Sequence, residues 1–288
     1  MMAGAGMLRF TIMAARPGFW LTSIWFYLLP CGGVWVFNRP LFWLGLVYVT
    51  VPLGLLIYGL NDLADRETDR VNPRKGTFLF GARGGEDQLR KLPWVVFLVQ
   101  VPFLILLVCL EGPKIIGWFL GLLALIATYN WPGWGFKNRP FLDMLNQAGY
   151  LLVFVLSSWL AGVPQLSGAV FFFGLLFAMH SHLLGQIMDV EPDKIAGRRS
   201  TAVVLGVVPA KCLLAGLLLA EAALLGFALH QPLAAGALVC GAGYFLLDAL
   251  LLWGARPYSP GMMRFYLMGW NVVALFTMPY IWASGIFV

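Results

Sequence analysis

The sequence predicts an all-α, polytopic membrane protein, and three observations support this fold class. Hydrophobic residues make up 60% of the 288 residues, charged residues only 11%, and the mean hydropathy is +0.82. Soluble domains are about half apolar and about one quarter charged, so a soluble globular protein is excluded. An aromatic content of 15% excludes a disordered chain. Apolar stretches of spanning length, separated by short polar loops, then predict a bundle of transmembrane helices.

Each predicted helix is an apolar stretch close to the roughly 20 residues that cross the hydrocarbon core of a bilayer. The predicted spans are 18–37, 41–60, 92–110, 115–131, 141–162, 166–188, 207–229, 232–253 and 265–286. We expect these nine spans to form a single domain over residues 1–288, with cap loops at about 61–91, 131–140 and 189–206. No apolar segment with a cleavage site precedes the first span, so we expect no removable signal peptide.

Basic residues predict the orientation of the bundle. With nine spans, 17 of the 19 Lys and Arg residues fall on the side of the N-terminus, and only Arg39 and Lys114 fall on the other. The positive-inside rule places the basic side in the cytoplasm, so we expect a multi-pass protein of the cell inner membrane whose functional side faces the cytoplasm. The net charge of +6 does not indicate a nucleic-acid partner, because the charges are spread over short loops rather than over one basic face.

Eleven of the 13 acidic residues share the basic side, which orientation alone does not require. The first acidic cluster follows the second span in the run NDLADRETD, and its oxygen-bearing side chains are Asn61, Asp62, Asp65 and Asp69. Residues three or four positions apart share one helix face, so we expect these side chains to form one stripe. Carboxylates with one amide are a donor set typical of Mg²⁺ that is also held by water and phosphate oxygens.

A second cluster closes the sixth span in the run DVEPDKIAGRRST, where Asp189 and Asp193 are four residues apart. Both clusters end even-numbered spans, so we expect them at the same depth on the same side of the membrane. Pro192 falls inside the second run and removes a helical hydrogen bond, so we expect the helix to kink or end near Asp189. For either cluster alone, a solvated helix end remains the alternative.

Cations lie in the loops between the two clusters. The candidates for binding an anion are Lys137 and Arg139 before the fifth span and Arg74 and Lys75 in the run NPRKG, with Arg198 and Arg199 as further candidates. Lysine and arginine beside carboxylates can bridge a polyanion that a metal also holds. For each cation, a topology signal without further role is the alternative interpretation.

At these residues the sequence resembles the UbiA superfamily of intramembrane prenyltransferases. The family pattern NDxxDxxxD after the second helix is complete at 61–69, and the pattern DxxxDxxxG after the sixth is complete at 189–197. The loop from Tyr129 to Lys137 resembles the third conserved element, and Arg16-Pro17 resembles the usual opening. The resemblance covers about residues 16–206 by motif and the remainder by helix count.

The resemblance implies nine helices around a lipid-open central cavity, where an isoprenyl group passes from an isoprenyl diphosphate to a lipophilic acceptor and diphosphate is released. It implies Mg²⁺ as the cofactor, held by Asn61, Asp62, Asp65, Asp69, Asp189 and Asp193, with Asp65 and Asp189 as the expected catalytic residues. The residues expected to bind the diphosphate are Lys137, Arg139, Arg74 and Lys75. Such a clamp neutralises the charge that builds up on the leaving diphosphate, and aromatic rings can face the allylic cation.

The acceptor is predicted from two loop sequences. NPRKG stands where many quinone-type members carry an NRPxPSG-like run, which indicates a different acceptor. Together with FKNRPFLD, this run resembles the lycopene elongase branch, which prenylates the end of a carotenoid. A carotenoid such as lycopene is therefore one expected acceptor, and a quinone-type aromatic is the other.

Five further side chains are expected to line the substrate cavity: Tyr58, Tyr129, Asn146, His182 and Gln186. His182 lies on the helical stripe that leads through Gln186 to Asp189, so it is a candidate for accepting the departing proton or contacting the acceptor. The more ordinary interpretation is a histidine that is hydrogen-bonded within the bundle. Tyr58 and Asn146 could likewise serve helix packing.

An ion-coupled secondary transporter is the alternative from another functional class. Transporters of this kind bind their ions near the bilayer midplane on broken helices, whereas most acidic residues here lie at helix ends. The only mid-span acid is Glu221, and the sequence shows no evident partner for it. The paired aspartate motifs therefore favour an enzyme.

Overall fold

Helices form most of the structure, a computed structural model that describes residues 2–288 and the side chains of residues 6–288. The α-helices are α1 (Met2–Ala14), α2 (Trp20–Leu28), α3 (Pro40–Tyr48), α4 (Val51–Gly54), α5 (Leu60–Ala64), α6 (Arg66–Val71), α7 (Glu86–Glu111), α8 (Lys114–Asn130), α9 (Leu142–Leu145), α10 (Leu152–Ala161), α11 (Gly168–Ile195), α12 (Thr201–Leu205), α13 (Val207–Ala223), α14 (Pro232–Leu247) and α15 (Pro260–Ser284). Short 3₁₀ or π segments adjoin them: η1 (Pro17–Phe19), η2 (Leu29–Cys31), η3 (Leu55–Gly59), η4 (Phe136–Asn138), η5 (Asn146–Leu151), η6 (Leu224–Ala228) and η7 (Asp248–Leu252). The all-α prediction is confirmed.

Each of the nine predicted spans contains helix within residues 2–288, although the first is helical only as far as Cys31, so the count of nine is approximate. Six segments are long and apolar enough to cross a membrane: Pro40–Ala64, Glu86–Glu111, Leu142–Ala161, Gly168–Ile195, Val207–Ala228 and Pro232–Leu252. The second span is not one regular helix, because it passes through α3, α4, η3 and α5. Pro52 lies at its break, where a missing backbone N–H interrupts the helical hydrogen bonds.

Helix α1 precedes the first span and was not predicted. It packs against η3 and α7, and its Phe10 and Met13 are buried. The helix ends at Ala14, and Arg16 two residues later has a φ of 49°, in the left-handed region, because the following proline disfavours the right-handed helical conformation. Gly18 then allows close approach of the next loop, since a Cβ there would lie 2.4 Å from the carbonyl oxygen of Leu79. This turn directs Arg16 toward the ends of the second and sixth spans.

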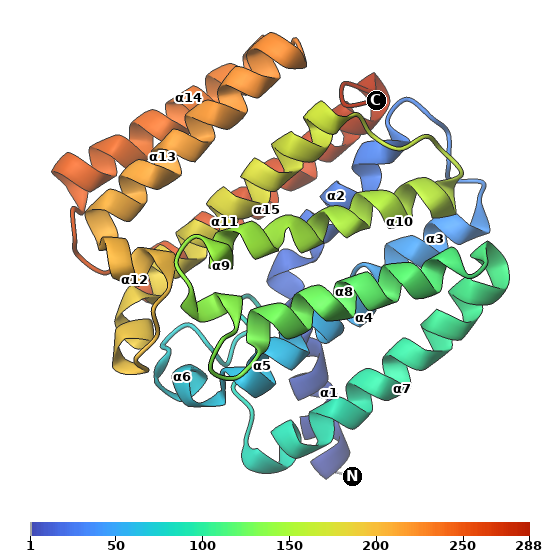
Figure 1. The fold of residues 1–288 in the computed structure, drawn as a ribbon, viewed down its shortest axis with the longest axis horizontal. Coiled ribbons are helices and arrows are strands. Elements are labelled where there is room, and N and C mark those ends of the chain that lie inside the picture. Colours follow the sequence, from blue (N-terminus) through green and yellow to red (C-terminus); the bar gives the residue numbers. More distant parts are fainter. Residues whose placement is uncertain (1) are drawn as a thin grey trace.

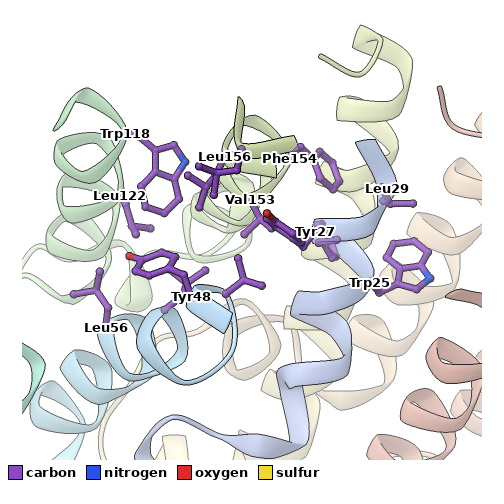
Figure 2. Packing of buried hydrophobic residues seen from close by; sticks show 14 of the residues in the cluster. Trp25, Tyr27, Leu29, Tyr48, Leu56, Trp118, Leu122, Val153, Phe154 and Leu156 are labelled. Carbon is purple, nitrogen blue, oxygen red and sulfur yellow. The ribbon is translucent and has the colours of Figure 1, made fainter. Parts of the chain in front are cut away.

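The helices are arranged around α2, α10, α11 and α15 (Figure 1). Helices α13 and α14 pack against each other on the side of α11, while α7 and α8 form a pair on the opposite side. The main apolar core lies between α2, α3, α8 and α10, where Tyr27, Tyr48 and Phe154 are almost fully buried (Figure 2). The Tyr27 hydroxyl donates to the Phe42 carbonyl at 3.0 Å, and the Tyr48 hydroxyl donates to Gln100 Oε1 at 3.0 Å. Both buried tyrosine hydroxyls therefore have a hydrogen-bond acceptor.

Large apolar side chains also cover the outside of the bundle. Phe227 is 85% exposed, Leu233 is 88% exposed and Phe276 is 76% exposed. Exposure of this much apolar surface to water is unfavourable, whereas its contact with lipid tails is not. The exposed faces of α13, α14 and α15 are therefore suited to contact with a bilayer.

Candidate active site

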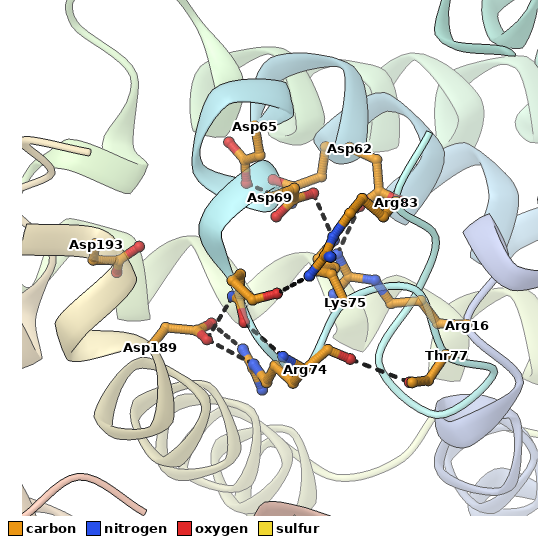
Figure 3. A network of polar contacts seen from close by, with 12 residues as sticks. Arg16, Asp62, Asp65, Asp69, Arg74, Lys75, Thr77, Arg83, Asp189 and Asp193 are labelled. Carbon is orange, nitrogen blue, oxygen red and sulfur yellow. Dashed lines mark hydrogen bonds and ion pairs between the residues drawn. The ribbon is translucent and has the colours of Figure 1, made fainter. Parts of the chain in front are cut away.

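A cavity of ≈ 1440 Å³, counted with its open mouth, lies where the ends of α5 and α11 approach each other. Its rim is polar and is lined by Asn61, Asp65 and Asp69 from the first motif and by Asp189 and Asp193 from the second. Its inner wall is apolar and includes Phe26, Leu53, Ile57, Val153 and Phe177. The two aspartate sets, which are more than a hundred residues apart in sequence, thus face one space (Figure 3).

The first motif keeps its helical spacing across a break in the chain. Helix α5 ends at Ala64 and α6 begins at Arg66, with Asp65 between them at φ −103° and ψ 9°. The backbone N–H of Asp65 still donates to the Asn61 carbonyl at 2.9 Å, and that of Asp69 donates to the Asp65 carbonyl at 2.9 Å. The side chains of the motif therefore stay close together, as the predicted stripe requires.

Asp65 is buried and holds two cations from other loops. Its Oδ1 lies 2.7 Å from Lys137 Nζ and is also paired with Arg198, while its Oδ2 accepts from Asn61 Nδ2 at 2.8 Å. Burial works to raise the pKa of Asp65, but Arg198 and Lys137 outweigh it and hold the pKa below its ordinary value. Asp65 is therefore an ionised carboxylate at neutral pH.

Asp62 lies behind the rim, where two cations neutralise it. Its Oδ1 is 3.0 Å from Arg16 Nη2 and 2.6 Å from Lys75 Nζ. Lys75 also contacts Asp69 Oδ2 at 2.7 Å. Burial raises the pKa of Asp69 to about 6, against the opposing effect of Lys75. The first motif is thus a compact set of carboxylates that ammonium and guanidinium groups hold together.

The second motif lies on α11, which continues past Pro192 to Ile195. We expected a kink or an end near Asp189, and the helix end is wrong. Asp189 Oδ1 accepts from Arg74 Nε at 2.6 Å and from Asn72 Nδ2 at 2.9 Å. Through these bonds the loop that follows the first motif is tied directly to the second motif.

Asp193, one turn further along α11, faces the turn that begins at Gly197. Its Oδ2 accepts from Ser200 Oγ at 3.1 Å, and its Oδ1 is 3.5 Å from Arg198 Nη1. Gly197 adopts a φ of +69° and the Arg198 N–H donates to the Asp193 carbonyl at 2.9 Å. This turn brings Arg198 between Asp193 and Asp65, so one guanidinium bridges the two motifs.

The donor chemistry of the rim fits Mg²⁺, because carboxylate and amide oxygens are the ligands that this ion prefers. Asn61 Oδ1 and Asp62 Oδ2 are buried without a hydrogen-bond partner, which is costly unless another group binds them. Within the described residues no three His, Cys, Asp or Glu side chains are already arranged as a metal site. Lysine and arginine occupy the positions between the carboxylates instead.

The charges of the rim balance. Five cations (Arg16, Arg74, Lys75, Lys137 and Arg198) face five carboxylates (Asp62, Asp65, Asp69, Asp189 and Asp193). A diphosphate ester would add several negative charges to this neutral set in a largely buried place. Binding it therefore favours simultaneous binding of divalent cations.

Most of the predicted site residues lie on this cavity. Lys137, Arg74 and Lys75 line it, as do Tyr58, Tyr129, His182 and Gln186. Tyr58 lies under Arg16, whose guanidinium carbon is 4.5 Å from the ring centroid, and its hydroxyl accepts from Tyr150 at 3.0 Å.

Three predicted residues do not line this cavity, and one of them is Asp62, which lies behind the rim. Arg139 is exposed and does not line the cavity, whereas Lys137, in the preceding turn η4, does. Asn146 lines a smaller adjoining cavity of ≈ 610 Å³ between α8 and η5, with Leu122, Leu125 and Ile126.

The structure adds residues that sequence reasoning did not include in the predicted site. Arg198 was only a further candidate, and its role depends on the turn at Gly197 rather than on any helical period. Asp143 is fully buried and accepts from Gln186 Nε2 at 2.7 Å and from the Thr201 N–H at 2.7 Å. It joins α9, α11 and α12 below the rim. In the sequence, Asp143 was visible only as the final acid of the run FKNRPFLD.

The expectation that Glu221 has no partner was wrong. Its Oε1 lies 2.5 Å from His180 Nδ1. The mid-span acid that the sequence left as a lone charge is therefore one half of a buried pair.

Comparison with known proteins agrees with the geometry. A family model described as the UbiA prenyltransferase family matches residues 19–273. A lycopene elongase/hydratase of Corynebacterium glutamicum is 32% identical over 207 residues, which cover 69% of this chain and 70% of that protein. Another, from Halobacterium salinarum, is 33% identical over 235 residues, which cover 75% and 78%.

Solved structures share the fold. A UbiA homolog from Archaeoglobus fulgidus bound to DMAPP and Mg²⁺ matches with a TM-score of 0.70 at 19% identity, covering 94% of this chain and 97% of that one. The same homolog bound to GPP and Mg²⁺ matches with a TM-score of 0.67. From the family match over most of its length, this chain belongs to the UbiA prenyltransferase family and is an integral, multi-pass membrane prenyltransferase.

Proposed function

We propose that this protein transfers an isoprenyl group from an isoprenyl diphosphate to the end of a linear carotenoid such as lycopene, with Mg²⁺ as cofactor and release of diphosphate. The single observation that carries the proposal is the meeting of two aspartate motifs and five cations at the mouth of an apolar cavity. This arrangement suits a ligand with a highly charged head and a hydrocarbon tail.

The charged head of the donor would bind at the rim. The six oxygen-bearing side chains that would hold Mg²⁺ are Asn61, Asp62, Asp65, Asp69, Asp189 and Asp193, and the bound metal would supply positive charge to the leaving diphosphate. Lys137, Arg198 and Arg74 would turn from their carboxylates to the phosphate oxygens, because each is ion-paired with a carboxylate whose place the diphosphate can take.

The hydrocarbon tail would lie along the apolar wall. When the C–O bond of the donor breaks, an allylic cation remains, and water must be kept from it. Phe26 and Phe177 offer ring faces in this part of the cavity, and Val153 and Leu53 exclude water beside them. Aromatic faces stabilise cations through their quadrupoles.

The lining also supports a neutral acceptor. Every charged residue on the cavity wall belongs to the rim set already engaged with carboxylates or with the proposed diphosphate site. An acidic aromatic acceptor would find no further cation there. The similarity to lycopene elongase/hydratases, which act on a carotenoid by name, supports the same acceptor.

We further propose that the rim faces the cytoplasm and that the protein resides in the cell inner membrane. The rim lies at the ends of the second and sixth spans, on the side that carries 17 of the 19 basic residues. The positive-inside rule supports this orientation.

Purified protein in lipid nanodiscs, supplied with Mg²⁺, tests the function directly. Lycopene and a hydroxylated aromatic acid are offered as acceptors with DMAPP or GPP as donor, and products are identified by mass spectrometry. We expect elongated carotenoid and equimolar diphosphate. Expression in carotenoid-producing and quinone-producing hosts gives the matching comparison in cells. Prenylation of the aromatic acid alone, in both settings, would rule out the carotenoid as acceptor.

A further inference from the structure

A buried acid–base pair lies inside the bundle, apart from the charged rim. Glu221 on α13 is fully buried, and its Oε1 is 2.5 Å from Nδ1 of His180 on α11. Both residues belong to segments apolar enough to span the membrane. An ionisable side chain at such a position is expensive to bury and is by default a functional candidate.

The pair has a connection to the substrate cavity through Ser181. His180 Nε2 lies 3.4 Å from Ser181 Oγ, and Ser181 lines the cavity. Phe177, also on the cavity wall, packs against the imidazole with ring centroids 4.9 Å apart. A polar path therefore runs from Glu221 through His180 to Ser181, and it opens on the apolar part of the cavity.

The three side chains are arranged so that a carboxylate, Glu221, orients a base, His180, which faces the hydroxyl of Ser181. An ionised Glu221 accepts from Nδ1–H of His180, which fixes the tautomer that leaves a lone pair on Nε2. That lone pair can accept from the Ser181 hydroxyl. Protonation of His180 then produces an imidazolium directly beside the Glu221 carboxylate, so the pair stabilises the proton it receives.

His182, which the sequence offered as a candidate for accepting the proton, is less suited to this task. Its Nε2 lies 3.4 Å from the Tyr129 hydroxyl, and no carboxylate is paired with it among the described residues. The rim cations cannot accept a proton, and the rim carboxylates are engaged with cations. His180 is the histidine with a bound carboxylate.

We propose that Ser181, His180 and Glu221 form a proton relay for the final step of isoprenyl transfer; this rests on the function proposed above. The donor C–O bond breaks with its electron pair on the diphosphate, and the alkene of the acceptor forms the new C–C bond and becomes a tertiary cation. The adjacent C–H electron pair then forms the product double bond. The proton of that C–H bond passes to Ser181 Oγ while the hydroxyl proton of Ser181 passes to His180 Nε2. His180 gives this proton to water when the product leaves.

The test separates donor ionisation from acceptor conversion. For each variant, diphosphate release and elongated carotenoid are measured together in nanodiscs, and their ratio gives the coupling of the reaction. His180→Gln and Glu221→Gln are expected to release diphosphate within about 2-fold of the unmodified protein, but to form about 100-fold less elongated product per diphosphate, as for loss of a general base. Ser181→Ala, which leaves the buried pair intact, is expected to lose coupling in the same direction.

Two controls separate the relay from a structural role. His230→Gln changes an exposed histidine and is expected to keep full coupling. In His180→Ala, added imidazole is expected to restore coupling, whereas sodium chloride of equal ionic strength is not. Retained coupling in Ser181→Ala and Glu221→Gln, or equal losses of both products in every relay variant, would overturn the proposal.

Failure of the proposed function gives a different result. In that case the unmodified protein itself forms no elongated carotenoid. The coupling measurement is then made with the aromatic acceptor, whose ring cation must lose a proton by the same chemistry. A lower ratio of prenylated product to diphosphate in the relay variants would support the relay, and an unchanged ratio would overturn it.

Discussion

Lys137 and Asp65 form an ion pair of 2.7 Å between Nζ and Oδ1, although 72 positions of chain separate them. Lys137 comes from the loop between the fourth and fifth spans, and Asp65 comes from the end of the second. Both side chains are less than a tenth exposed. The pair shows that this loop reaches the cavity rim and brings its cation to the first aspartate motif.

Lys137→Ala is expected to weaken donor binding, because it removes a cation from the proposed diphosphate site. We expect kcat/KM for the isoprenyl diphosphate to fall about 30-fold, which corresponds to about 2 kcal/mol for a charge-assisted hydrogen bond. Arg139→Ala is the matched control, since it removes an exposed cation from the same loop. Steady-state kinetics of diphosphate release checks both, and equal losses in the two variants would show that the loop cations act only through overall charge.

Substitution of the motif aspartates is expected to abolish transfer without unfolding the protein. Asp65→Asn and Asp189→Asn keep the shape of the side chain but remove the charge that Mg²⁺ would need. We expect turnover to drop by about 100-fold or more, the range seen when a group that stabilises transition-state charge is lost. Glu67→Gln lies within the same motif but is exposed, so it should retain activity. Full activity in either aspartate variant would remove that residue from the site.

Much of the site could be predicted because its residues recur at helical spacing. Asn61, Asp65 and Asp69 are four positions apart, and the structure keeps them together even where the helix breaks at Asp65. Arg198 and Glu221 show the limit of such reasoning. Arg198 reaches Asp65 only through a left-handed turn at Gly197, and Glu221 meets His180 only because α11 and α13 pack together.

In the fold, too, the features set by local sequence were predicted and those set by tertiary packing were not. Apolar length alone predicted the spans, because each must bury about 20 residues in lipid. It did not predict α1, since a helix of 13 residues before Arg16 is too short to register as a span. Apolar length also did not predict the interruption of the second span near Pro52. There Gln100 Nε2 donates a hydrogen bond to the Pro52 carbonyl at 2.7 Å.

Mg²⁺ and donor are expected to stabilise the protein together rather than separately. The rim is neutral without them, so either ligand alone would leave buried charge uncompensated. A ligand present at about 100 times its Kd stabilises the folded state by about 2.7 kcal/mol. We expect thermal unfolding in detergent to shift upward with Mg²⁺ and isoprenyl diphosphate together and little with either alone. A chelator should then remove both the shift and the activity. A full shift with the diphosphate alone would show that the protein's own cations suffice.

The pair of Lys211 and Asp248 provides a test of structure that is independent of the active site. Lys211 Nζ is 2.7 Å from Asp248 Oδ2 and donates to the Gly254 carbonyl at 2.8 Å, and both side chains are fully buried. Tyr258 donates to the same Asp248 oxygen. In the sequence Lys211 counted only as one of the basic residues that set topology, whereas the structure uses it to hold α13 against η7.

Lys211→Met is expected to destabilise the protein by about 3–5 kcal/mol, because it leaves the Asp248 carboxylate buried without its cation. The double variant Lys211→Met with Asp248→Leu removes both charges and should recover most of the lost free energy of unfolding, because two apolar side chains can replace a buried ion pair with little change in stability. Unfolding in detergent measures the stabilities, and diphosphate release per folded molecule should stay near that of the unmodified protein in both. If the double variant is as unstable as the single one, the bond from Lys211 to Gly254, rather than the ion pair, holds these helices together.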